Sequence, residues 1–361
     1  MDRTLAPAPR SRRWLRRVGL AAVGMAGALV VGELGVRASA AWVSPRARVP
    51  DARLGWVHTP RMSRVYTNEH GERCTFATNK WGHRGGAVSK ARLLGRFRAL
   101  FLGDSFTEGI QVDQREVFTA RLEVQKPEVE AINTGVSCYG TVQQLLYMRD
   151  EGVDFAPDLV VLMFYANDLA DNVHPWFLGV GARPYAELRD GEVYLFENWS
   201  DEVYLPFCLP LPFRGTLFRH SELYQSINLK VWQKLFARPL IRRDEATQRR
   251  PSRKDQCHVF LAMLDQLREV VATRTRAEFA VVMIPTMHQV RRPELPSYPD
   301  VERGLRQRGL RVLHLAEALR AARADGEHLY FDEDKHWTKH GHAVAAREIA
   351  RLVLDVQVGG R

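Results

Sequence analysis

The sequence predicts an α/β fold built on a mostly parallel five-stranded sheet. From Arg98 onward, short apolar runs alternate with segments whose apolar residues recur at helical spacing. Strands that alternate with helices pair in parallel, because each connecting helix covers one face of the sheet. The chain has 361 residues and a hydrophobic content of 45%, which is enough to bury a large core.

The predicted domain covers residues 97–357. Its strands are expected at Arg98–Leu102, Glu130–Ile132, Leu159–Tyr165, Glu278–Ile284 and Arg311–Leu313. Its helices are expected at Phe118–Val124, Thr141–Met148, His258–Thr273, Val301–Arg308 and Gly341–Leu354. Ligands of such sheets bind at the carboxyl ends of the strands, so the residues that follow each strand are the candidates for chemistry.

The N-terminal segment has the pattern of a membrane anchor. Residues 1–17 carry six Arg and one Asp, and an apolar stretch follows from Val18 to Val31, extended weakly to Val36. About 20 such residues suffice to span a bilayer. We therefore expect a cytoplasmic basic N-terminus at 1–17, an anchor at 18–40 and an exported remainder. Because Ala38-Ser39-Ala40 resembles a peptidase site, secretion after cleavage stays an alternative.

Two further segments interrupt the strand and helix pattern. Residues 41–96, rich in Pro, Gly, Asn and Arg, predict an irregular lead-in with room for a short hairpin. Residues 174–256, with several prolines and many aromatics, predict one long insertion after the third strand. This insertion holds a second basic cluster, Ala237–Lys254, which either faces anionic lipid or an acidic polymer or is a solvated loop.

Composition argues against nucleic-acid binding and against a metal or other cofactor. The net charge of +10 comes from the two Arg-rich clusters, and no recognised nucleic-acid-binding module is present. The four cysteines are too far apart for a Cys-x-x-Cys motif, although an exported chain permits one disulfide. His336, His340 and His342 have ligand-like spacing, but the glutamate of a His-Glu-x-x-His zinc site is missing.

A serine follows the first predicted strand in the run Gly103-Asp104-Ser105. A hydroxyl held there lies at the carboxyl edge of the sheet, where a nucleophile is accessible. The run differs from the Gly-x-Ser-x-Gly elbow of α/β-hydrolases, because Thr107 occupies the position of the second glycine. Ser105 is therefore the predicted nucleophile.

Hydrogen-bond donors follow the next two strands. Gly135 comes after the second strand and Asn167 after the third. Acyl transfer builds negative charge on the former carbonyl oxygen, which fixed donors stabilise. The backbone N–H groups of Ser105 and Gly135 and the side chain of Asn167 are the predicted oxyanion hole.

His336 is the predicted general base, because acidic residues precede it in a loop after the last strand. The base needs a carboxylate that fixes its tautomer and stabilises the imidazolium. Asp334, two residues before His336, is the preferred acid, and Glu333 is held in reserve.

These separated blocks, in this order, resemble the SGNH/GDSL hydrolase superfamily from about Arg98 to Leu354. The resemblance implies a flavodoxin-like three-layer α/β/α fold, no metal and an acyl-enzyme intermediate. The usual family spacing would make Glu333 the acid. By contrast, Asp334-Lys335-His336-Trp337 looks like the Asp-x-His-Trp pattern of the branch related to alginate O-acetylation proteins. Leu54-Gly55-Trp56 also resembles membrane-anchored members.

The leading functional prediction is a serine esterase that hydrolyses an O-acyl ester, either of a small molecule or linked to a glycan, through an acyl-enzyme on Ser105. One alternative is an O-acyltransferase acting on exported or cell-wall polysaccharide. A further alternative is a non-catalytic protein that binds glycan or an envelope-assembly partner.

Overall fold

The computed structural model describes residues 10–42, 47–177, 181–197, 217, 221–227, 251–295 and 298–359. The chain divides into two compact units, and each is described by itself. The first unit comprises residues 1–45 and 205–239, and the second unit comprises residues 46–204 and 240–361.

The first unit contains the long helix α1 (Arg10–Trp42) and the short helix α8 (Glu222–Ile227). Residues Trp14–Val36 of α1 form a stretch of 23 residues that is long and apolar enough to cross a membrane. This helix fits either a membrane anchor or a signal sequence. Beside α8, the Ser221 hydroxyl and the Leu223 N–H donate to the Glu33 carboxylate at 2.8 and 3.0 Å.

A five-stranded parallel sheet forms the centre of the second unit, which confirms the predicted fold class. Its strands lie in the order β13-β12-β7-β5-β6 and all pair in parallel. Their bounds are β5 Phe97–Leu102, β6 Val129–Asn133, β7 Leu159–Phe164, β12 Glu278–Met283 and β13 Arg311–His314. Each lies within about two residues of its predicted position.

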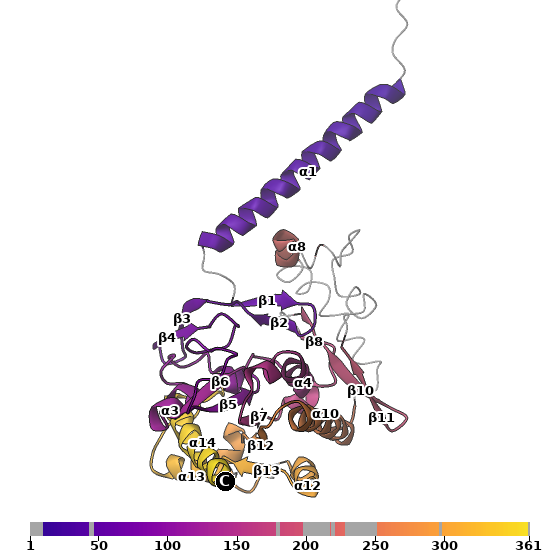
Figure 1. The fold of residues 1–361 in the computed structure, drawn as a ribbon. Helices are drawn as coiled ribbons and strands as arrows, with labels where there is room; N and C mark the ends of the chain where they lie inside the picture. The colour runs from indigo at the N-terminus through magenta and orange to yellow at the C-terminus, as the bar shows by residue number, and fades with distance from the viewer. Residues whose placement is uncertain are drawn as a thin grey trace, which may run out of the picture. The chain divides into compact units, whose positions relative to one another are not determined.

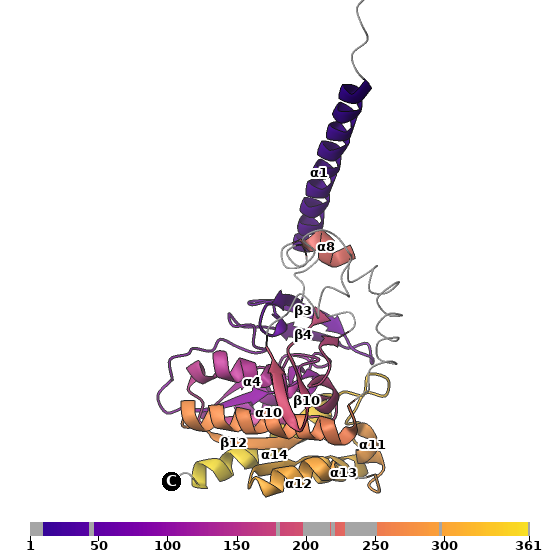
Figure 2. The same ribbon diagram turned by 90° about the vertical axis from the view of Figure 1, so that its right-hand side faces the viewer.

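Helices cover both faces of this sheet (Figures 1 and 2). Residues of β7 alternate between two buried clusters: Val160, Leu162 and Phe164 face one, and Leu159, Val161 and Met163 face the other. The first cluster is completed by α4 (Thr141–Asp150), α10 (Arg253–Arg274) and α12 (Pro299–Gln307). The second is completed by α3 (Phe118–Gln125), α13 (Ala316–Ala324) and α14 (Lys339–Gly359). The expected three layers are therefore present.

Smaller elements connect these layers. They are α2 (Ser105–Glu108), the 3₁₀ helix η1 (Gly152–Phe155), α5 (Asp168–Asp171) and α11 (Met287–Arg291). None of these four was predicted, and neither was α13. Each is short, so its hydrophobic pattern spans too few turns to stand out in the sequence.

The lead-in is more ordered than predicted. It forms two antiparallel hairpins, β1 (Arg48–Asp51) with β2 (Gly55–His58), and β3 (Ser63–Thr67) with β4 (Arg73–Ala77). Leu54 and Trp56 are buried in the same cluster as the sheet. The Trp56 indole also donates to the Ser137 carbonyl at 3.2 Å, which ties the lead-in to the loop after β6.

The predicted insertion is described only in part. Its first residues form β8 (Trp176–Phe177) paired with β9 (Gly181–Ala182), and β10 (Tyr185–Arg189) paired with β11 (Glu192–Phe196). Most of the second basic cluster lies outside the described residues. Its last two residues, Arg253 and Lys254, begin α10 after a capping box at Ser252.

Candidate active site

Ser105 begins helix α2, three residues after the last residue of the inner strand β5. The Asp104 carboxylate caps this helix by accepting the Phe106 N–H at 3.0 Å. A side chain at Gly103 could not fit, because its Cβ would lie 2.9 Å from Thr107 Cβ and 3.1 Å from Met163 Cβ. The glycine thus permits the tight turn that presents the serine at the edge of the sheet.

The structure brings Ser105, His336 and Asp334 together in a hydrogen-bonded chain. His336 Nε2 lies 2.7 Å from Ser105 Oγ. His336 Nδ1 contacts Asp334 Oδ1 in a short hydrogen bond. This arrangement orients the Nε2 lone pair toward the serine hydroxyl when Nδ1 carries the proton. The described contacts give this position to Asp334, whereas Glu333 has no hydrogen bond to the histidine among them.

Electrostatics around the histidine favour its protonated form. Burial alone lowers the pKa of His336, but hydrogen bonding to Asp334 and the charges of Asp334 and Asp104 raise this pKa above its ordinary value. Burial likewise opposes ionisation of Asp334, yet its contact with His336 brings the Asp334 pKa below the usual range. The pair therefore stabilises the imidazolium that forms when the serine loses its proton.

Two neighbours hold these side chains in place. The Gln111 amide donates to both Asp334 oxygens at 3.2 and 3.3 Å. The Phe106 ring lies against the His336 ring, with centroids 4.8 Å apart. Gln111 carries no motif of its own, so sequence reasoning did not identify it.

Asn167 follows β7, and its side-chain amide already has partners. Its Nδ2 donates to Asp171 at 2.8 Å, and the Asn167 side chain also hydrogen-bonds the Asp104 carboxyl group. Asp171 in turn accepts from Arg183, a buried residue of the insertion, at 2.8 Å. The Ser105 N–H, by contrast, has no acceptor among the described residues, so it remains available to an incoming oxygen.

Gly135 has a different role in the structure. Its single N–H donates to the Asn133 side chain at 3.0 Å, so the hydrogen expected to face an oxyanion is already engaged. A Cβ at this position would come within 2.5 Å of the Glu108 nitrogen. The glycine therefore allows the loop after β6 to pack on the backbone of α2.

Two fully buried carboxyl groups lie beside the site. Burial raises the pKa of Asp104 to about 6, although hydrogen bonds from the Phe106 amide and the Asn167 side chain oppose the rise. Burial, and then the charge of Asp104, raise the pKa of Asp168 well above its ordinary value. Because like charges in a dry site are costly, an ionised Asp104 opposes ionisation of Asp168.

A buried polar cluster connects the lead-in to α2. The Glu108 carboxylate, 1% exposed, contacts the Ser137 hydroxyl and lies 2.6 Å from His58 Nε2. Arg84, also buried, donates to the carbonyls of Glu108 at 2.5 Å and of Val112 at 2.7 Å. These contacts fix the turn that follows the nucleophile.

The histidines of the alternative metal site do not converge. His342 is buried, its ring 5.4 Å from that of Trp337, whereas His340 is exposed. Among the described residues no group of three His, Cys, Asp or Glu side chains could hold a metal ion. Cys74, Cys138 and Cys257 are free thiols, and Cys208 lies outside the described residues.

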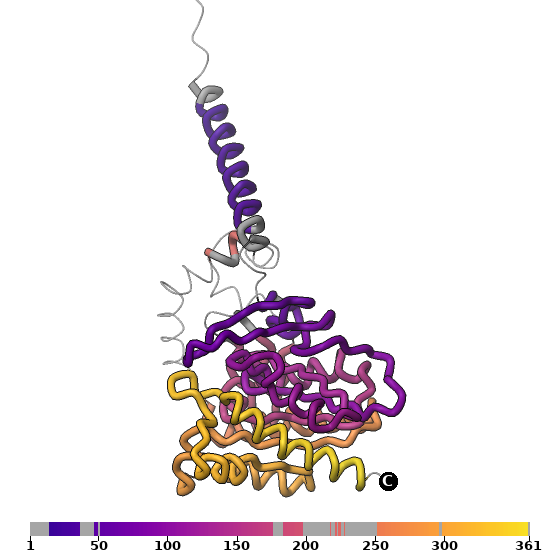
Figure 3. Tube along the Cα trace, turned by 90° about the vertical axis from the view of Figure 1, so that its left-hand side faces the viewer, coloured from indigo at the N-terminus to yellow at the C-terminus, as the bar shows by residue number. Residues whose placement is uncertain are grey.

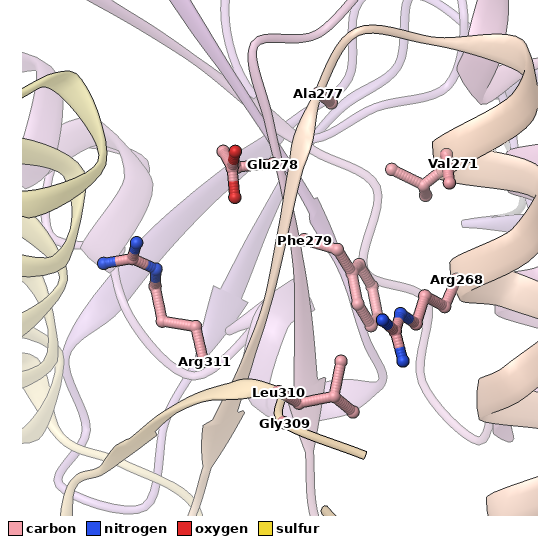
Figure 4. Close-up of a pocket in the computed structure, with 9 residues that line it drawn as sticks. Arg268, Val271, Ala277, Glu278, Phe279, Gly309, Leu310 and Arg311 are labelled. Atoms are coloured by element: carbon pink, nitrogen blue, oxygen red, sulfur yellow. The ribbon is translucent and has the colours of Figure 1, made fainter. Parts of the chain in front are cut away.

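One cavity of the described structure lies away from this site. It has a volume of about 290 Å³ and is lined by residues that include Arg268, Glu278 and Arg311 (Figure 4). Glu278 and Arg311 begin their strands, whereas Ser105 follows the end of β5. In a parallel sheet these are opposite edges, so the cavity does not serve the serine.

The C-terminal part of the chain is similar to a known family. A family model described as an SGNH hydrolase-like domain of the acetyltransferase AlgX matches residues 252–360. This match confirms the resemblance predicted from the sequence. It spans α10 to α14 and includes Asp334 and His336.

Comparison with solved structures gives matches of low sequence identity. One is a member of the lipolytic G-D-S-L family from Veillonella parvula, with 12% identity, 71% of this chain and 97% of that chain covered, and a TM-score of 0.39. Another is a variant of the acetylxylan esterase Axe2 from Geobacillus stearothermophilus, with 12% identity, coverages of 72% and 95%, and a TM-score of 0.40. No curated protein sequence matches this chain significantly.

Replacing the two candidate acids should distinguish their roles. Asp334→Asn removes the charge that raises the His336 pKa and stabilises the wrong tautomer, so kcat for an ester substrate should fall by about 10⁴-fold. The midpoint of the acid limb of kcat/KM, where His336 loses its proton, should move to lower pH. Glu333→Gln is the matched control and should change neither value. If Glu333→Gln lowered kcat and moved the acid limb while Asp334→Asn changed neither, Glu333 would be the acid.

Proposed function

We propose that the second unit, from here on called the catalytic unit, is a serine esterase that forms an acyl-enzyme on Ser105. The observation that carries this proposal is the 2.7 Å hydrogen bond between Ser105 Oγ and His336 Nε2, with Asp334 bound to the other ring nitrogen. These are the nucleophile, base and orienting acid that acyl transfer requires. The substrate class is an O-acyl ester, either of a small molecule or linked to a glycan.

The proposed reaction runs in two halves. His336 takes the proton of Ser105 as its oxygen attacks the acyl carbonyl, and then gives that proton to the leaving alcohol. Water, activated by the same histidine, releases the acid from Ser105. The Ser105 N–H and the side-chain amide of Asn167 are the proposed donors to the oxyanion, because the N–H has no acceptor in the described contacts and Asn167 follows the neighbouring strand at the same edge of the sheet.

Hydrolysis of p-nitrophenyl acetate by the full-length protein in detergent tests this proposal. Ser105→Ala and His336→Ala should reduce the rate to the level of the uncatalysed reaction. Asn167→Ala should lower kcat by about 10²- to 10³-fold, since it removes one oxyanion donor. Ser63→Ala, at an exposed position of β3, is the matched control and should be neutral. Activity that survives Ser105→Ala would refute the mechanism.

A second candidate is O-acyl transfer to a sugar hydroxyl. It is favoured by the family model over residues 252–360, whose description names an acetyltransferase. The two candidates share the first half-reaction and differ only in the acceptor that attacks the acyl-enzyme.

Adding an oligosaccharide acceptor to the same assay distinguishes the candidates. A transferase should produce an acetylated sugar, detected by mass spectrometry, at the expense of free acetate. An esterase should release acetate in the same amount with or without the sugar. Ser105→Ala provides the background in both measurements.

We further propose that α1 anchors the protein and that the catalytic unit is exported. The support is the stretch Trp14–Val36, with four arginines before it and two more, Arg16 and Arg17, within its first turn. Positive charges are retained on the cytoplasmic side of a membrane helix, so the C-terminal part is placed on the opposite side.

Fusion of alkaline phosphatase after Arg361 tests this orientation. The enzyme requires disulfides and is active only in an oxidising compartment, so bacteria that express the fusion should show phosphatase activity. The same fusion without residues 1–42 should be inactive. Activity of both, or of neither, would contradict the proposed export through α1.

A further inference from the structure

The tip of the β3–β4 hairpin contacts the loop that carries Asp334 (Figure 3). One oxygen of the Glu69 carboxylate accepts the N–H of Asp332 at 2.7 Å. The other accepts the N–H groups of Glu333 at 2.9 Å and of Asp334 at 3.0 Å. A single side chain from the lead-in thus binds three successive amides of the loop, the last of which belongs to the candidate acid.

The hairpin tip is itself fixed, so Glu69 is held on a rigid turn. The Asn68 side-chain oxygen accepts the N–H groups of His70 and Glu72 at 3.0 and 2.9 Å. Two flanking contacts reach the same part of the chain. The His70 ring lies 4.8 Å from the Phe331 ring, and Glu72 pairs with Lys339 at 3.1 Å.

The loop that carries Asp334 depends on these hydrogen bonds, because side chains do not fill the space on its side that faces the β3–β4 hairpin. A cavity of about 150 Å³ lies there, and Glu69, Gln111, Phe331 and Asp334 are among its lining residues. Lys335, between the acid and the histidine, has a φ of 68°, a left-handed conformation that L-residues avoid. Hydrogen bonds are therefore what holds this turn in place.

We propose that Glu69 is a positioning residue, whose carboxylate fixes the Asp332–Asp334 turn so that Asp334 stays bound to His336. The inference rests on the proposed serine mechanism. Glu69 contacts neither Ser105 nor His336 in the described structure and acts only through the loop. The amides of Asp334, Glu333 and Asp332 hold the pKa of Glu69 below its usual range, although slight desolvation opposes them. The group is therefore an anion, as this role requires.

The rate at which a fluorophosphonate labels Ser105, measured against pH, tests the role of Glu69. This probe reports activation of the serine in an esterase or a transferase alike, and the full-length protein in detergent is used. Glu69→Ala should slow labelling by about 10- to 100-fold, since small displacements of catalytic groups cost that much. The midpoint of the acid limb should move to lower pH, because a displaced Asp334 raises the His336 pKa less. Glu69→Gln keeps an acceptor oxygen without the charge, and its loss should be intermediate.

Lys339→Ala is the matched control, because it removes the exposed Glu72 ion pair at the same contact and leaves the three amides bound. Its labelling rate should stay within about twofold of the parent rate. The inference is overturned if Glu69→Ala keeps the parent rate and pH profile. It is also overturned if Glu69→Ala lowers both the labelling rate and the melting temperature but leaves the midpoint of the acid limb unchanged. The same holds if Lys339→Ala slows labelling as much as Glu69→Ala does. Failure of the parent protein to label, or equal labelling of Ser105→Ala, would instead refute the serine mechanism itself.

Discussion

The parallel pairing of β5 with both of its neighbours is the constraint on which the site depends. Ala99 and Leu100 of β5 lie opposite Leu159 and Val160 of β7, and β6 pairs on the other side in the same direction. All three strands therefore end at one edge, which brings Ser105 and Asn167 together although they are far apart in sequence. The loop with His336 reaches this edge from the C-terminal end of the chain. A single antiparallel strand here would separate these groups.

The elements predicted best from the sequence are the strands that helices cover on both faces. Strand β7, Leu159–Phe164, is apolar throughout because helices cover both of its faces, so its limits were predictable. By contrast, β3 alternates between exposed and half-buried residues and contains Ser63 and Arg64, so it gave no clear strand pattern.

The predicted oxyanion role of Gly135 shows a further limit of prediction from the sequence. The sequence places a glycine after a strand, but only the structure shows that the Asn133 side chain accepts its N–H.

The lead-in belongs to the catalytic unit for an electrostatic reason. Glu108 lies three residues after Ser105 and is buried, and an unpartnered carboxylate in such a place would destabilise the fold. Its partner His58 comes from β2, and the nearby Arg84 follows the β3–β4 hairpin. Such long-range partners have no fixed spacing from the nucleophile, so no local motif could identify them. The same holds for Glu69, which binds amides more than 260 residues away in sequence.

The charges around His336 bear on both half-reactions equally. In the proposed mechanism the His336 imidazolium forms once when Ser105 attacks and again when an acceptor attacks the acyl-enzyme, and the charges of Asp334 and Asp104 favour this protonated form both times. They therefore accelerate transfer to water and transfer to a sugar hydroxyl by the same means, and cannot select between the two. Selection requires a difference in how the acceptors bind, since specificity is a difference between two transition-state free energies. The proposed esterase and transferase thus share one catalytic chain, and the residues that would separate them are those that contact the acceptor.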